Sequence, residues 1–67
     1  MNAKAIGKRL IALRGNRTQE EVAKAIGSSV SAIGMYERGE RIPRDEIKLS
    51  IAKYYDKTVQ SIFYADE

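Results

Sequence analysis

Arg38, Arg41 and Arg44 lie around a segment that would link two helices, and their side chains suit the binding of an anion. A guanidinium stays protonated at any physiological pH and matches the geometry of a phosphate group. Residues 1–44 hold nine Lys and Arg against four Asp and Glu, a balance of +5, whereas residues 45–67 hold three Lys against five Asp and Glu, a balance of −2. A basic surface attracts a polyanion through counterion release. The same charges also suit a plain solvated surface, so charge alone leaves both interpretations open.

The usual general base of enzymes and the commonest zinc ligands are missing. With neither Cys nor His among its 67 residues, the chain has no disulfide, no thiolate metal site and no imidazole base. A carboxylate such as Glu37, without a second acid, makes no hydrolase. We therefore expect no enzyme activity, no metal and no cofactor.

The chain shows no membrane segment and no secretion signal. Its longest apolar run, residues 10–13, is far shorter than the roughly 20 residues of a membrane-spanning helix, and the first ten residues carry charges throughout. We expect a cytoplasmic protein without a membrane partner.

The basic residues need a scaffold, and the spacing of apolar residues predicts an all-α fold of five short helices in a single domain, residues 1–67. The expected helices cover about 3–13, then the segment from Thr18 to Gly27, the segment from Ser29 to Arg38, about 44–55, and a last turn after Thr58. No strand is expected.

The second and third expected helices are joined by Gly27 and Ser28 alone. So short a connection forces the two helix axes to cross steeply, as in a helix-turn-helix, here over about 18–38. Gly27 supplies the positive φ that the turn needs, and Thr18 and Ser29 cap the two helix starts.

One face of the third helix is left uncovered when Ile33 and Tyr36 point inward. An uncovered helix in basic surroundings fits the DNA major groove, and we expect Ser31 and Met35 to lead the base contacts. The full set of expected base contacts is Val30, Ser31, Ala32, Gly34 and Met35. Serine pairs with either base type, and Val30, Ala32 and Met35 can touch a thymine methyl, so the readout is mainly apolar. Gly34, which costs roughly 1 kcal/mol against alanine, either lets the backbone approach DNA or is merely tolerated.

Contacts to the DNA backbone are expected from helix starts, which attract anions, and from basic side chains. These residues are Thr18, Gln19, Ser29, Lys8, Arg17, Arg38, Arg41 and Arg44. Arg44 is also the best candidate to reach a minor groove. Solvated surface positions remain the alternative for Gln19 and for the loop arginines.

The stretch TQEEVAKAIGSSVSAIGMYERGERIP, residues 18–43, resembles the DNA-binding domain of the xenobiotic-response-element (XRE) family, the lambda-repressor/Cro-like group of phage and bacterial regulators. The shared pattern falls on Thr18, Gln19, Val22, Ala23, Gly27, Ser29, Ile33, Tyr36, Glu37, Gly39 and Pro43, and IAKYYDKTVQSIF resembles the closing helices of the same domain. The resemblance implies a lambda-repressor-like fold and a transcriptional repressor of phage or mobile-element type. It also implies a structural ion pair between Arg14 and Glu37.

Apolar and aromatic residues gather near the acidic end of the chain, and core packing explains some of them. We also expect them to join two copies in a homodimer over about 54–64, through Tyr54, Val59, Ile62, Phe63 and Tyr64. Such a dimer would bind double-stranded DNA at a near-palindromic operator with half-sites about 34 Å apart. The alternative is a protein-interaction module, such as an antitoxin or an antirepressor-binding subunit, whose partner is a toxin or antirepressor protein.

Overall fold

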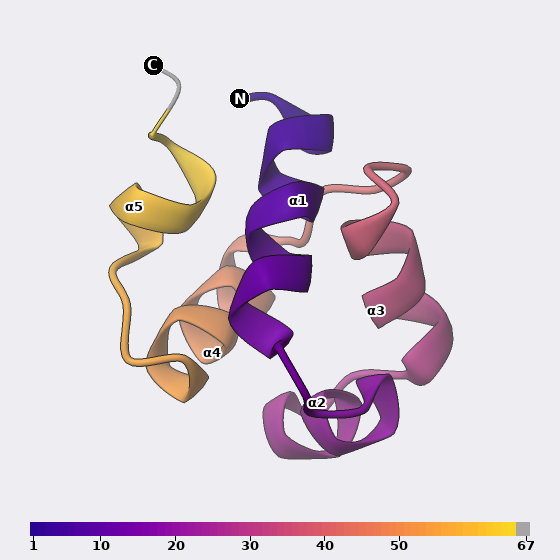
Figure 1. The fold of residues 1–67 in the computed structure, drawn as a ribbon. Helices are drawn as coiled ribbons and strands as arrows, with labels where there is room; N and C mark the ends of the chain where they lie inside the picture. The colour runs from indigo at the N-terminus through magenta and orange to yellow at the C-terminus, as the bar shows by residue number, and fades with distance from the viewer. Residues whose placement is uncertain (66–67) are drawn as a thin grey trace.

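Five helices and no strand form within residues 1–65, the part of the chain that the computed structural model describes. They are α1 (Ala3–Arg14), α2 (Gln19–Ile26), α3 (Val30–Glu37), α4 (Asp45–Tyr54) and α5 (Val59–Phe63). The predicted all-α, lambda-repressor-like fold is confirmed (Figure 1). No helix within residues 1–65 is both long enough and apolar enough to cross a membrane.

Side-chain caps set four of the five helix starts. Side-chain oxygens of Asn2, Thr18, Ser29 and Thr58 each accept a hydrogen bond of 3.0 Å from the backbone N–H three residues further on. These bonds satisfy N–H groups that have no partner within the helix. Arg44 precedes α4 without a side-chain cap, because a guanidinium has no acceptor for a backbone N–H.

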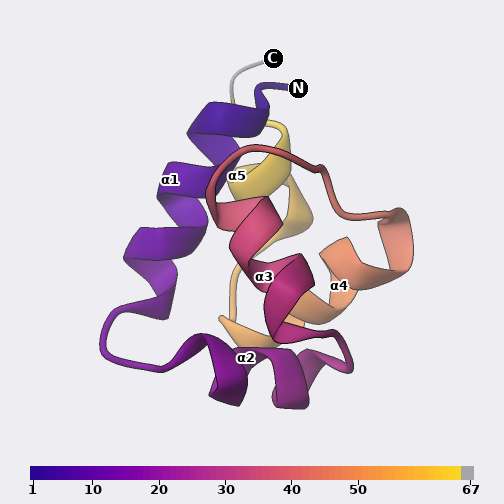
Figure 2. The same cartoon turned by 90° about the vertical axis from the view of Figure 1, so that its right-hand side faces the viewer.

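The connection between α2 and α3 is the tight turn expected for a helix-turn-helix. Gly27 has φ +71° in the left-handed region, and the N–H of Ser28 donates to the carbonyl of Ala23 at 2.8 Å. Ser29 then starts α3 at once. As a result α2 runs across one end of α3, which lies at the front of the molecule in Figure 2.

The core is formed by inward-facing residues of all five helices. Its buried members are Ile6, Leu10, Val22, Ala23, Ile26, Ala32, Ile33, Tyr36, Ile51, Ala52, Ile62 and Phe63. Gly7 lets α1 approach α3 closely, because a Cβ at this position would overlap the backbone carbonyl of Glu37. The end of α3 is therefore held directly against the middle of α1.

The short helix α5 belongs to the core of the single chain. Phe63 is completely buried and Ile62 is 2% exposed, and the guanidinium of Arg9 in α1 donates to the carbonyl of Ile62 at 2.6 Å. The expectation that Ile62 and Phe63 join two copies is therefore wrong, because both side chains are already buried in the core of the single chain. Tyr54, Val59 and Tyr64 are only partly buried.

Lys48 is buried, which its sequence context did not indicate. Its Nζ donates to the hydroxyl of Tyr64 at 3.1 Å and lies 3.5 Å from Asp45 Oδ1, with the Phe63 and Tyr64 rings beside it. The bond to Tyr64 raises the pKa of Lys48 despite its burial. Tyr64 is thus tied to its own α4.

Candidate nucleic-acid interface

The outward face of α3 carries Val30, Ser31 and Met35. Val30 and Ser31 are exposed and Met35 is partly exposed, as expected when Ile33 and Tyr36 point into the core. Ala32 does not belong to this face. It is 8% exposed and packs in the core, so the expected base contact from Ala32 is wrong.

Gly34 also lies on the outward side of α3, but the side chain of Arg38 covers it. A Cβ at Gly34 would come within 2.9 Å of Arg38 Nη1, and the next nearest atoms, at 3.6 and 3.7 Å, also belong to the guanidinium of Arg38. Gly34 has no side chain of its own, so the flexible end of the Arg38 side chain lies directly over its backbone.

Arg38 is held by Glu40, on the far side of the turn at Gly39. Arg38 Nε donates to Glu40 Oε2 at 2.9 Å and Nη2 donates to Oε1 at 3.2 Å. The hydrogen bonds raise the pKa of Arg38 and lower the pKa of Glu40. Both side chains remain more than half exposed. The carboxylate of Glu40 therefore neutralises the positive charge of Arg38 locally.

Arg41 and Arg44 lie beside the turn of the helix-turn-helix. Both are exposed, and both line a hollow of about 230 Å³ together with Gly27 and Ser28. The capped start of α3 borders the same region, where unpaired backbone N–H groups favour negative charge. The structure thus brings two arginines and the start of the outward-facing helix to one side of the molecule.

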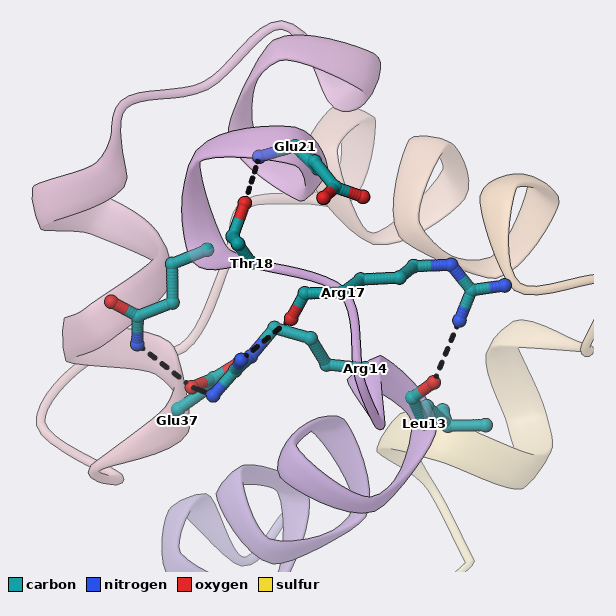
Figure 3. A network of polar contacts seen from close by, with 7 residues as sticks. Leu13, Arg14, Arg17, Thr18, Glu21 and Glu37 are labelled. Carbon is teal, nitrogen blue, oxygen red and sulfur yellow. Dashed lines mark hydrogen bonds and ion pairs between the residues drawn. The ribbon is translucent and has the colours of Figure 1, made fainter.

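Glu37 joins three helices through one carboxylate. Arg14 of α1 donates to it from Nε at 2.7 Å and from Nη2 at 3.1 Å, and Gln19 of α2 donates from Nε2 at 2.9 Å. Arg14 Nη1 also donates to the carbonyl of Arg17 at 2.8 Å. Figure 3 shows the Glu37 carboxylate facing the guanidinium of Arg14. The hydrogen bonds from Arg14 to the Glu37 carboxylate raise the pKa of Arg14. The network fixes α3 against α1 and α2.

Gln19 therefore has a structural contact that sequence reasoning did not identify. One hydrogen of its side-chain amide goes to Glu37. The second amide hydrogen and the backbone N–H at the start of α2 stay available to a phosphate. The hydroxyls of Thr18 and Ser29 accept their caps and can each still donate one hydrogen bond.

Arg17 and Lys8 do not join this group. The guanidinium of Arg17 lies 5.5 Å and 5.6 Å from the ring centres of Tyr54 and Tyr55, and its Nη1 donates to the carbonyl of Leu13 at 3.1 Å. In Figure 3 Arg17 extends away from Glu37 and α3. Arg17 therefore lies away from the α3 face, and the expected phosphate contact from it stays a prediction. Lys8 is exposed on α1, apart from the turn.

Comparisons with known proteins agree with this architecture. The sequence model of one protein family, described as helix-turn-helix, matches residues 4–62. A curated protein of Bacillus subtilis, named uncharacterized HTH-type transcriptional regulator YazB, is 49% identical over 45 residues, covering 64% of this chain and 65% of the relative. The chain thus spans less than two thirds of the length of that relative. No solved structure gives a significant match.

Proposed function

This chain belongs to the helix-turn-helix family of the XRE type, a family of DNA-binding transcription regulators, and from that premise we propose that it binds double-stranded DNA sequence-specifically and represses transcription. The observation that carries the proposal is the outward face of α3, with Arg41 and Arg44 at its starting end. As a DNA-binding repressor the protein would act in the cytoplasm, on an operator of phage or mobile-element type.

The proposed contacts divide by position. In the major groove Val30, Ser31 and Met35 would face base edges, where apolar groups meet thymine methyls and a hydroxyl pairs with either base type. Around the groove, helix starts and basic side chains would meet phosphates. Those residues are Thr18, Gln19, Ser29, Arg41 and Arg44. Lys8 and Arg17, which do not join this group, are further phosphate candidates. Arg44 is also the best candidate to reach a minor groove, as an alternative to a phosphate.

The small size of one recognition face supports a homodimer as part of the proposal. A single small module buries only about 600–1,000 Å² on DNA. Two copies would cover half-sites about 34 Å apart and add their contacts. With Ile62 and Phe63 in the core, the proposed dimer surface is reduced to Tyr54, Val59 and Tyr64. Sedimentation at micromolar concentration tests it: a monomer that selects an asymmetric single site would rule out the dimer.

A protein-interaction function is the second proposal, and one surface feature favours it. A groove of about 310 Å³ between α1 and α5 is lined mainly by apolar atoms of Arg9, Ala12, Leu13, Lys57, Ser61 and Ile62. An antirepressor or toxin protein is the kind of partner that such a module would bind. In that case the groove between α1 and α5, and not the outward face of α3, would be the main binding surface.

Selection of bound duplexes from a random pool tests the DNA proposal. We expect one near-palindromic sequence to be enriched and its affinity to fall steeply with salt, because each neutralised phosphate releases counterions. Arg44→Ala should weaken this binding. A pool that stays random, together with affinity independent of salt, would contradict the proposal and favour a protein partner.

A further inference from the structure

Arg38 places its charge a full turn away from its own backbone. It follows Glu37 at the end of α3, and long side chains on a helix point back toward the helix start. The nearest atoms to a Cβ at Gly34 would be Arg38 Nη1 at 2.9 Å, Cζ at 3.6 Å and Nη2 at 3.7 Å. The guanidinium therefore rests on the backbone that Gly34 leaves bare, in the middle of the outward face of α3.

Glu40 fixes the orientation of that guanidinium. The carboxylate takes the edge formed by Nε and Nη2, at 2.9 Å and 3.2 Å. Of the five guanidinium N–H groups, Glu40 uses two, so the end formed by Nη1 and Nη2 keeps three donors. An arginine that is clamped on one edge offers the other edge in a defined direction.

The charge balance decides which DNA group this edge suits. A phosphate would meet Glu40 as well as Arg38, and a neutral pair gains little from counterion release. The O6 and N7 atoms of guanine are uncharged acceptors in the major groove, spaced for two parallel N–H donors. The pair therefore fits a base edge better than it fits the DNA backbone.

We propose that Arg38 reads a guanine in the major groove, with Nη1 and Nη2 donating to O6 and N7, and that Glu40 and Gly34 position its guanidinium. The proposal rests on DNA binding through α3, as proposed above, and replaces the expected backbone contact of Arg38. This contact would give the face one base position with a strong sequence preference, whereas its other base contacts are mainly apolar.

Arg38→Lys is the decisive variant, because lysine keeps the positive charge and loses the paired donors. Sequences selected by the wild-type protein should contain one guanine per half-site whose replacement lowers affinity roughly 5- to 150-fold. For Arg38→Lys this penalty should fall to about twofold or less at the same position. The matched control is Arg41→Lys, which should retain the guanine penalty.

Two further variants test the positioning. Gly34→Ala inserts a methyl group where Nη1 lies, and only a flexible side chain has to move. It should keep or raise the melting temperature and still reduce the guanine penalty severalfold. Glu40→Gln removes one negative charge, so overall affinity for duplex DNA should rise while the guanine penalty falls.

The outcomes separate this inference from the proposed function. If the wild-type protein enriches a sequence but Arg38→Lys keeps the same preference with uniformly lower affinity, Arg38 is a phosphate contact and the inference is wrong. The inference is also wrong if the enriched sequence contains no guanine whose preference is lost in Arg38→Lys. If the wild-type protein enriches nothing, the proposed function fails together with the inference.

Discussion

Replacing Glu37 with alanine removes the acceptor of three hydrogen bonds that join α1, α2 and α3. Breaking a buried ion pair by removing one partner costs about 3–5 kcal/mol, because the other charge stays buried without its partner. The Glu37 side chain is 6% exposed, but that of Arg14 is 22% exposed and can recover some hydration. We therefore expect the lower end of that range, about 3 kcal/mol.

A loss of that size is large for so small a domain. At roughly 0.05–0.15 kcal/mol per residue, 67 residues give a free energy of unfolding of about 3–10 kcal/mol. Each kcal/mol shifts the melting temperature of a domain of this size by about 4–8 °C, so Glu37→Ala should lower it by roughly 12–24 °C. Much of the protein would then be unfolded near body temperature.

Thermal melts followed by far-ultraviolet circular dichroism measure this effect directly, and the chain contains a matched control. Glu40→Ala breaks an arginine–carboxylate pair of the same chemistry at 2.9 Å, but both side chains of that pair are more than half exposed. Water and salt screen such a pair, so its melting temperature should hardly change. A decrease of only one or two degrees for Glu37→Ala, or equal decreases for both variants, would refute the reasoning from burial.

Three other changes give clear expectations. Gly7→Ala should strongly lower the urea midpoint of unfolding, because the added methyl meets backbone at the end of α3; an unchanged midpoint would contradict the close helix contact. Ending the chain after Lys57 should abolish the helical circular dichroism signal, since Ile62 and Phe63 leave the core; a folded fragment would show that α5 is dispensable. Arg44→Ala should weaken binding to all duplexes about equally and reduce the salt slope by about one; a new preferred sequence would instead indicate that Arg44 reads DNA shape or bases.

The helices themselves are predictable because their signals are local. A capping oxygen and the N–H that it binds are three residues apart, as at Thr18 and Ser29, and a left-handed glycine such as Gly27 ends its own helix. The burial of Lys48 depends on Tyr64, sixteen residues away in the chain, and Gly7 matters only through the end of α3. Pairings over such distances leave no local signal.

The same limit applies to the site. Val30, Ser31 and Met35 point outward because Ile33 and Tyr36 point inward, which periodicity predicts. The same reasoning misplaced Ala32, which lies at the border of the inward face.

The direction of a side chain depends on neighbours that sequence does not place. Arg38 bends onto Gly34 because the turn at Gly39 brings Glu40 within reach. Arg17 turns toward Tyr54, in a helix that begins far along the chain. The apolar residues of α5 gave no sign whether they would pack within one chain or between two.

The hydrogen-bond network at Glu37 bears on how a protein of this kind could come to bind a different DNA sequence. It orients α3 from the helix end and from the inward face, and it uses none of the outward residues Val30, Ser31 and Met35. Substitutions at exposed positions outside such a network usually change stability by no more than about 0.5 kcal/mol. New combinations at these three positions can therefore accumulate at little cost in folding, and one scaffold can pass between different operators through folded intermediates.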